Sequence, residues 1–177
     1  MDIKFLKIDD RAVIPTKRDE DAAFDLYTTC AGYEDRVEDK EIIIRPGETV
    51  KLLTGLKAVI PSDVWVLLKE RSSTAKTGLS IRSGVIDSGY RGEWAIMMTN
   101  CGRINVHISR DYHGKPEFRK SMSRYFDGYW IMSFDKAIAQ AVVMPKLDVS
   151  CGEISQAEFD AAPETIRGDS GWGASGK

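Results

Sequence analysis

The feature of this sequence that most constrains its fold is a series of short apolar runs with a period of two. Glycine, proline, aspartate or asparagine separates the runs, as in Pro46-Gly47 and Asp87-Ser88-Gly89. The runs expected to form strands are 42–44, 49–53, 56–60, 64–68, 94–98, 129–134 and 139–144. Many short strands at such spacing are typical of an all-β sandwich or barrel. The sequence therefore predicts an all-β fold.

Helix signals are confined to two places. Ser155 and Glu158 form a capping box, which predicts one short helix that Pro163 ends. A further turn of helix is expected at 72–76. At 177 residues the chain is long enough to bury a core. We expect one β-rich domain over residues 1–162, followed by a glycine-rich tail over 163–177.

Composition argues against several classes of protein. The net charge of −2 leaves no electrostatic footprint for nucleic acid over the whole chain, so no direct nucleic-acid role is expected. The chain contains no apolar run of about 18 residues and no basic-then-apolar amino terminus, so neither a membrane span nor a signal peptide is expected. The 3 widely spaced cysteines favour reduced thiols in a cytoplasm over a disulfide or zinc framework.

A basic segment interrupts the β pattern. Residues 102–124 carry six basic side chains against two acidic ones, and both histidines of the chain. Three interpretations remain open: a solvated insertion loop, a basic patch for a partner or nucleic acid, and a metal site formed by His107, Asp111 and His113.

The tail contains Gly171 to Lys177, which matches the dinucleotide pattern G-x-G-x-x-G and most of a phosphate loop. Neither motif is expected, because each needs a helix after it. Composition alone favours a disordered tail. Trp172 between glycines is unusual in a solvated linker, and it keeps a functional interpretation open.

Two stretches combine acids and hydroxyls near strands. Asp25 follows apolar residues and is either a turn or cap residue or a functional acid. Arg71, Ser72, Ser73 and Thr74 follow an expected strand, where a guanidinium and hydroxyls suit phosphate oxygens. The alternative is an ordinary helix cap by Ser72.

Two further stretches combine apolar strands with polar residues. Asp87-Ser88-Gly89 predicts a tight hairpin, and Asp87 beside the apolar Ile86 can hold a water as a general base. Tyr90 offers a ring that can pack on a sugar. Gln140 interrupts an apolar strand, so its amide needs a ligand or the main chain as a partner.

The order of these stretches resembles the five ordered motifs of the trimeric dUTPase family. GVIDSGYRG, residues 84–92, is the most specific piece, and the RGDSGWGASG tail is the next. The resemblance extends from about residue 4 to Gly176, and an insertion at about 102–127 is similar to those of phage-type members. It implies jelly-roll subunits in homotrimers with shared active sites. These hydrolyse dUTP, with Mg²⁺, to dUMP and pyrophosphate in the cytoplasm, which is the host's if a phage encodes the protein.

The resemblance also implies roles for single residues at the nucleoside end. Asp87 would orient and deprotonate the water that attacks the α-phosphorus. Tyr90 would pack on the deoxyribose and leave no room for a 2′-hydroxyl. The backbone of Gly84, Val85 and Ile86 would read the uracil edge.

At the phosphate end the same resemblance implies a metal and an arm. Asp25 would hold the Mg²⁺ shell through water. The residues expected to contact the phosphate chain are Arg71, Ser72, Ser73 and Gln140, the last from a neighbouring subunit. The tail at 163–177 would close over the nucleotide as a flexible arm. Its contributing residues would be Arg167 at the γ-phosphate, Trp172 on the base, and Gly171, Gly173 and Ser175 around the phosphates.

Several positions depart from the family pattern. Ser73 replaces the usual Gly, Ala137 the usual Arg, Trp172 the usual Phe and Ala174 the first Ser of the tail. A dCTP deaminase shares the motif order, but the place of its catalytic glutamate falls at Met97, which cannot carry protons. A regulatory protein that binds a partner through the basic insertion is the alternative of another class.

Overall fold

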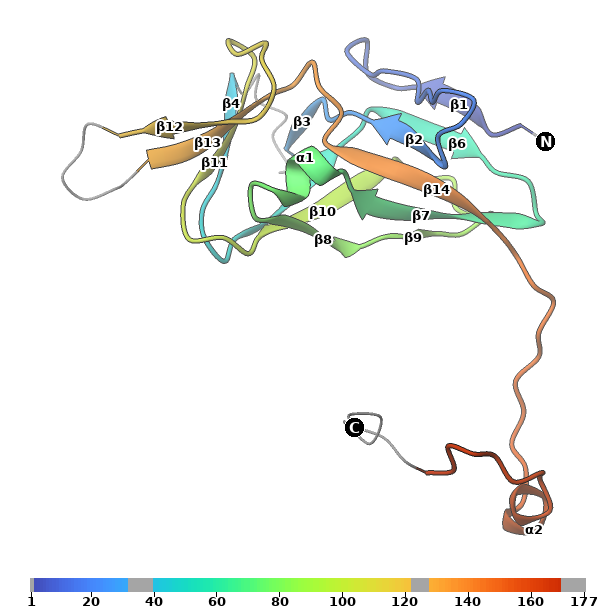
Figure 1. The fold of residues 1–177 in the computed structure, drawn as a ribbon. Helices are drawn as coiled ribbons and strands as arrows, with labels where there is room; N and C mark the ends of the chain where they lie inside the picture. The colour runs from blue at the N-terminus through green and yellow to red at the C-terminus, as the bar shows by residue number, and fades with distance from the viewer. Residues whose placement is uncertain (1, 32–39, 122–127, 170–177) are drawn as a thin grey trace. The chain divides into compact units, whose positions relative to one another are not determined.

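The computed structural model describes residues 2–31, 40–121 and 128–169 (Figure 1). Contacts along the chain divide it into two units, Met1–Lys146 and Leu147–Lys177. The first unit consists of short β-strands and one short helix, and it contains the hydrophobic core. The second contains one short helix. The all-β fold expected from the period of two is confirmed, as is the jelly roll that the family resemblance implies.

Two four-stranded sheets form the part of the first unit that carries the predicted site. One has the strand order β2 (Ala23–Leu26), β14 (Ala139–Pro145), β7 (Val64–Glu70), β9 (Val85–Ile86). The other has the order β3 (Cys30–Ala31), β5 (Thr49–Leu53), β10 (Ala95–Asn100), β8 (Leu79–Ser83). All neighbours within these two sheets are antiparallel.

The remaining strands form a third four-stranded sheet and a two-stranded one. The third sheet has the order β12 (Glu117–Lys120), β13 (Gly128–Ser133), β11 (Val106–Ser109), β4 (Glu41–Ile44), with β11 and β13 parallel. Strands β1 (Lys4–Lys7) and β6 (Leu56–Val59) pair antiparallel. The helices are α1 (Ser72–Ala75) and α2 (Gln156–Asp160).

The core forms because one face of each long strand points inward. In β7, Val64, Val66 and Leu68 are buried, whereas the residues between them are only half-buried. Leu52 and Ile96 from the second sheet and Ile44 from the third join the same buried cluster. Full burial of one such side chain stabilises the fold by about 1.5–3 kcal/mol.

Each apolar run predicted to be a strand is one. The strands that the sequence analysis did not list are short or polar, such as β8 and β12. Helix α2 begins with the predicted capping box, in which Glu158 N–H donates to Ser155 Oγ and the Glu158 carboxylate accepts from Ser155 N–H. The interpretation of Ser72 as a helix cap is wrong, because Arg71 is the N-cap of α1 and makes no side-chain capping bond.

The expected hairpin around Asp87 is also corrected. Tyr90 N–H donates to Asp87 O at 3.0 Å, which makes a turn. The strands on either side, however, belong to different sheets, because β9 pairs with β7 while β10 pairs with β5 and β8. Gly84 lies between β8 and β9, where the chain passes from the second sheet to the first, and its carbonyl accepts from Leu68 N–H at 2.7 Å. A Cβ at Gly84 would lie 2.7 Å from Leu68 O, so the crossing requires glycine.

The interpretation of the basic segment as a solvated loop is wrong for β11. Val106 and Ile108 of that strand are buried, and β11 lies between β4 and β13. Strand β12, in contrast, has every residue exposed. His107 contacts Glu41 and His113 contacts Asp135, so the two histidines have separate acidic partners. Within the described ranges, no three His, Cys, Asp or Glu side chains are grouped to hold a metal ion.

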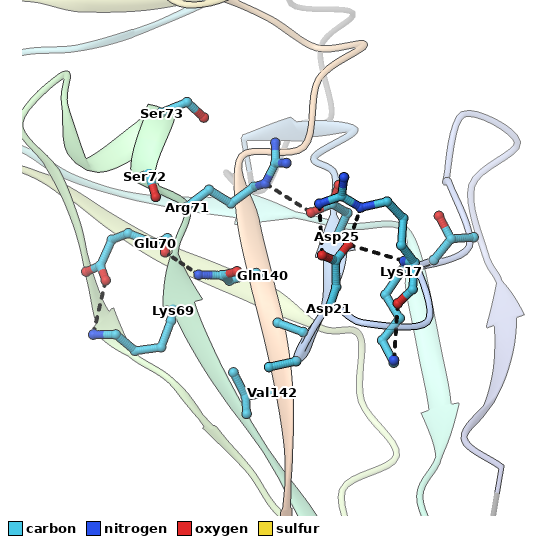
Figure 2. A pocket seen from close by; sticks show the side chains of 14 residues that line it. Lys17, Asp21, Asp25, Lys69, Glu70, Arg71, Ser72, Ser73, Gln140 and Val142 are labelled. Atoms are coloured by element: carbon cyan, nitrogen blue, oxygen red, sulfur yellow. Dashed lines mark hydrogen bonds and ion pairs between the residues drawn. The ribbon is translucent and has the colours of Figure 1, made fainter.

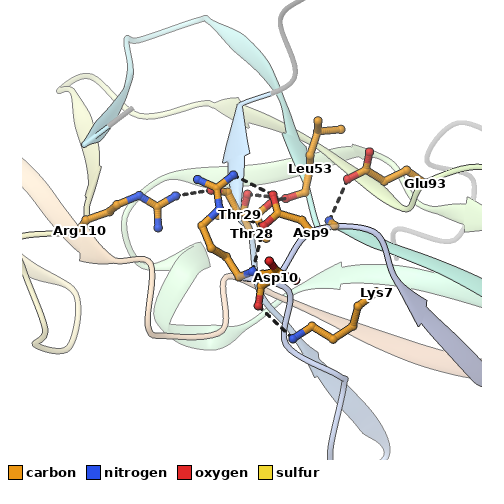
Figure 3. Close-up of polar contacts among 10 residues, drawn as sticks. Lys7, Asp9, Asp10, Thr28, Thr29, Leu53, Glu93 and Arg110 are labelled. Atoms are coloured by element: carbon orange, nitrogen blue, oxygen red, sulfur yellow. Dashed lines mark hydrogen bonds and ion pairs between the residues drawn. The ribbon is translucent and has the colours of Figure 1, made fainter. Parts of the chain in front are cut away.

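Polar contacts beside β3 tie the basic segment to the core (Figure 3). The hydroxyls of Thr28 and Thr29 donate to Leu53 O at 2.9 and 3.2 Å. The Arg110 guanidinium donates to Thr29 O and lies over the Phe134 ring, 4.2 Å from its centroid. Arg110 therefore supports the fold from within instead of adding to a solvent-facing basic patch. In the part of the chain that is described, no helix has the length and apolar character that a membrane crossing requires.

Candidate functional site

A pocket of about 930 Å³ lies where β2, β14 and β7 meet the start of α1 (Figure 2). Its volume is within the range of small-molecule sites. Five residues predicted from the sequence to contact phosphate or metal line this pocket: Asp25, Arg71, Ser72, Ser73 and Gln140. The structure thus brings together three segments that are far apart in the sequence.

Strand register explains this convergence. Gln140 of β14 lies opposite Asp25 of β2 on one side and opposite Lys69 of β7 on the other. Arg71 follows the last residue of β7 directly, so it projects from the end of the same sheet. The Gln140 amide donates to Glu70 O at 2.7 Å, which identifies the main chain as its partner in the structure.

The pocket holds an ion pair at its centre. Arg71 Nε lies 2.9 Å from Asp25 Oδ1, and each side chain is about one third exposed. Asp25 lies within a strand, so its interpretation as a turn or cap residue is wrong. Arg71 also donates to Ala137 O at 3.2 Å. Ala137, the position where the family pattern has an arginine, is buried and contributes its carbonyl to hold Arg71.

A second ion pair lines the pocket and was missed by the sequence analysis. Arg18 Nε and Nη2 each lie 2.9 Å from an Asp21 carboxylate oxygen. The hydrogen bond from Arg18 lowers the pKa of Asp21 below its ordinary value. Lys17 is also in the lining. The dense run of charges at 17–21, just before β2, is the signal that could have indicated these residues.

Glu70 is a further lining residue without a predicted role. Burial raises the pKa of Glu70, but hydrogen bonds from Ile81 N–H, its own N–H, Lys69 and Ser80 outweigh burial and lower that pKa to about 2. The carboxylate is therefore ionised at every pH at which the protein is expected to work. No local sequence signal identifies Glu70, because its partners are in β8, beyond α1.

Asp87 and Tyr90 lie away from this pocket. Ile86 pairs with Val66 near the start of β7, whereas Arg71 follows the end of that strand. Val66 and Arg71 are separated by roughly 17 Å of extended strand at about 3.3 Å per residue. Asp87 is exposed, and Tyr90 is 46 % exposed with its hydroxyl donating to Glu93 O.

Ile86 and Asp87 face different environments, although they are adjacent in the sequence. Ile86 points into the core and is 7 % exposed, so the next residue along the strand turns outward. Of the expected uracil contacts, Val85 is exposed and Gly84 is half-buried against β7. One chain therefore carries two separate groups of predicted site residues.

The predicted tail residues belong to the second unit or fall beyond the described ranges. Arg167 is exposed in the second unit. Gly171, Trp172, Gly173 and Ser175 lie outside the described residues, and their roles stay predictions.

The chemistry of the pocket suits a magnesium ion that arrives with a phosphate chain. Mg²⁺ keeps several waters and is commonly bound through one or two carboxylates plus substrate phosphates. Asp25 and Asp21 supply carboxylates in the lining. Both carboxylates are paired with guanidinium groups, which are themselves suited to phosphate oxygens. The lining residues thus fit a magnesium ion that is held partly by carboxylates of the pocket and partly by phosphate oxygens of the substrate.

Comparison with known sequences identifies relatives over the whole chain. The family model described as dUTPase matches residues 9–112. The deoxyuridine 5′-triphosphate nucleotidohydrolase of Clostridium tetani is 32% identical over 179 residues, with 99% of this chain and 95% of that protein covered. The chain is also 38% identical over 95 residues to the Pol polyprotein of equine infectious anemia virus, of which it spans only 7% of the length.

Comparison with solved structures shows the same fold. A dUTPase of Staphylococcus bacteriophage 80alpha, with dUpNHpp, has a TM-score of 0.71 at 20% identity and covers 99% of both chains. The native dUTPase of equine infectious anemia virus has a TM-score of 0.56 at 26% identity, over 87% of this chain and 97% of that chain. With the match of the family model and the full-length relatives, these findings establish that the chain belongs to the dUTPase family.

Proposed function

We propose that this protein hydrolyses dUTP to dUMP and pyrophosphate. The observation that carries the proposal is the pocket, in which a chain of the dUTPase family gathers Asp25, Arg71, Ser72, Ser73 and Gln140. The named relatives over the full length are deoxyuridine 5′-triphosphate nucleotidohydrolases, which supports the same reaction here.

The pocket binds the phosphate chain. Ser72 and Ser73 present hydroxyls and backbone N–H groups at the start of α1, and Arg71 adds a fixed positive charge. Arg71, which pairs with Asp25 in the structure, would contact a phosphate oxygen of the bound triphosphate, and Asp25 would hold the hydrated metal. Bound Mg²⁺ supplies charge neutralisation along the phosphate chain. Gln140 adds a hydrogen bond to a phosphate oxygen, from the same chain as Asp25 and Arg71 instead of from a neighbouring subunit as the sequence analysis expected.

The nucleoside end is formed by the turn at 87–90. Asp87 orients the attacking water and accepts its proton, so that oxygen bonds to the α-phosphorus while pyrophosphate leaves. Tyr90 packs on the deoxyribose and excludes ribose. The backbone of Gly84, Val85 and Ile86 reads the uracil edge. Closure of the arm, with Arg167 and Trp172, excludes bulk water.

The separation of Asp87 from the pocket supports sites shared between chains, and the family resemblance makes a homotrimer the assembly we propose. Arg71 and Ser72 of the pocket follow the end of β7, whereas Asp87 follows Ile86, which pairs with Val66 near the start of β7. This separation favours a site in which one chain supplies the pocket and another supplies Asp87. A symmetric assembly in which one subunit's turn faces its neighbour's pocket completes each site with identical chains.

The test is pyrophosphate release from dUTP beside dCTP, dTTP and UTP, with and without Mg²⁺. We expect release from dUTP alone among the four, and only with the metal. Equal release from UTP, or none from dUTP, would contradict the proposal. Ammonia release from dCTP would support deamination instead. Met97 on β10, where the deaminase needs a glutamate, disfavours that outcome.

A partner-binding role for the basic segment rests on one observation. Every residue of β12 is exposed, including Phe118 at 42 %. Deletion of the whole segment is unsuitable as a test, because it would remove the buried strand β11. The paired change Phe118→Ser and Lys120→Glu should leave dUTP turnover within about twofold if β12 serves a partner. Loss of turnover would assign β12 to the enzyme itself.

A further inference from the structure

Glu70, the last residue of β7, lines the pocket and makes contacts with two other strands. Its Oε1 accepts from Ile81 N–H at 2.6 Å and from Ser80 Oγ at 2.9 Å. Its Oε2 lies 3.1 Å from Lys69 Nζ. Its backbone carbonyl accepts from the Gln140 amide. One residue thus contacts both β8 and β14.

These contacts close the base of a loop. The chain leaves β7 at Glu70, passes through α1, and returns in β8 at Leu79. Strand β8 is at the edge of its sheet, so Ile81 has no strand neighbour on the side facing Glu70. The Glu70 carboxylate accepts the hydrogen bond that a neighbouring strand would otherwise accept from Ile81 N–H. It thereby holds the start of β8 beside the end of β7. The closed loop carries Arg71, Ser72 and Ser73.

The other anchors of the loop lie on its opposite side. Arg71 donates to Ala137 O, and Thr74 Oγ1 donates to Ile138 O at 2.8 Å. These bonds hold the loop to the segment before β14, whereas Glu70 holds it to β8. Without Glu70, the loop keeps these bonds, and Gly78 O at its far end still accepts from Cys101 N–H at 2.8 Å. The end that carries Arg71, Ser72 and Ser73 loses its side-chain contact with β8.

The direction of the carboxylate is compatible with an anionic ligand. Figure 2 shows the Glu70 carboxylate turned toward Lys69 and away from the Asp25–Arg71 pair. The N–H and O–H donors and Lys69 together offset its charge. A carboxylate pointing at the phosphates would repel them, so this direction matters.

We propose that Glu70 is a positioning residue for the triphosphate: it sets the geometry of the Arg71–Ser73 loop through β8 and that of Gln140 through its own carbonyl. The proposal rests on the proposed function of the same pocket. It assigns to Glu70 no contact with the substrate.

The test compares Glu70→Ala and Glu70→Gln with the control Glu48→Gln. Glu48 also accepts a backbone N–H with its carboxylate, from Arg45 at 2.8 Å, but in a turn outside the pocket. Calorimetry with Mg²⁺ measures binding of dUpNHpp and of dUMP. We expect Glu70→Ala to weaken dUpNHpp binding by about 10–100-fold and dUMP binding by less than about threefold, because displacing contacts to the extended phosphate chain spares the nucleoside end. Glu70→Gln should be intermediate, since its amide oxygen still accepts one bond.

Two outcomes would overturn the proposal. One is dUpNHpp binding by Glu70→Ala within about twofold of the unsubstituted protein, and the other is an equal loss for dUMP, which would indicate general damage. If Glu70→Ala does not fold, the loss of dUpNHpp binding is compared with the loss of dUMP binding in Glu70→Gln instead. If the unsubstituted protein neither binds dUpNHpp nor releases pyrophosphate from dUTP, the proposed function fails. Hydrogen exchange at the Ile81 amide then still tests the contact between Glu70 and β8, since retained protection of that amide in Glu70→Ala would contradict it.

Discussion

The two ends of β7 differ sharply. At its end, Asp25, Arg71 and Gln140 come together from three segments and are partly buried; Asp25 pairs with Arg71, and Gln140 donates to Glu70 O. Near its start, Asp87 and Tyr90 are exposed on a turn. The difference shows that folding of one chain assembles the pocket residues, whereas the residues of the turn stay exposed. Under the proposed function, the turn would act on a substrate held in the pocket of another subunit.

The largest expected effect on activity comes from a substitution at the exposed turn. Asp87→Asn should lower kcat for dUTP by about 10³-fold, within the range for loss of a general base, while dUpNHpp binding stays within about threefold. Steady-state kinetics and calorimetry measure both. Asp111→Asn, another exposed aspartate, is the control and should leave both unchanged. Unchanged turnover in Asp87→Asn would refute the assignment of the base.

Mixing two inactive variants tests whether the two ends act across chains. Asp87→Asn and Arg71→Ala should each be nearly inactive alone. Unfolded and refolded together, they should regain turnover, because some sites then combine an intact turn with a neighbour's intact pocket. Turnover of the mixture is compared with that of each variant refolded alone. No regain, with mixed oligomers shown by mass spectrometry, would mean that each chain completes its own site.

A smaller effect, on stability, is expected at Gly84, where the chain passes from β8 in one sheet to β9 in the other. Gly84→Ala should reduce the free energy of unfolding by about 1–3 kcal/mol, because its Cβ would lie 2.7 Å from Leu68 O. Gly89→Ala, on the exposed turn, is the matched control, since a Cβ there meets nothing within 4 Å. Urea unfolding measures both variants. Equal stability of the two would show that β9 can shift without cost.

A further effect at the end of β7 that carries the pocket is the pH dependence contributed by Glu70. Its pKa is about 2 in the folded state against 4.5 ordinarily, so its ionisation stabilises the fold fully above pH 4.5. That contribution is lost as the pH falls toward 2. The difference in unfolding free energy between the unsubstituted protein and Glu70→Gln should therefore shrink between pH 5 and pH 2.5. A constant difference would mean that the carboxylate is not held in its ionised form by folding.

Much of the fold was predictable because it depends on local sequence patterns. Alternating apolar residues in β5, β7 and β14 and the capping box of α2 depend on near neighbours only. The short strands β8 and β9 were not predicted, since they gain stability from partners distant in the sequence. The same reason explains why Glu70 was missed, because its partners Ser80 and Ile81 are reached only after the chain has turned through α1.

The sequence by itself determined the strand-rich class of this protein, the order of its motifs and the residue types that suit a phosphate chain. Only the tertiary structure decided that Asp25, Arg71 and Gln140 share one pocket and that Asp87 follows a strand paired near the start of β7. Side-chain alternation is a property of a few consecutive residues, whereas strand register depends on which distant strands pair. That pairing is set by burial of the common core.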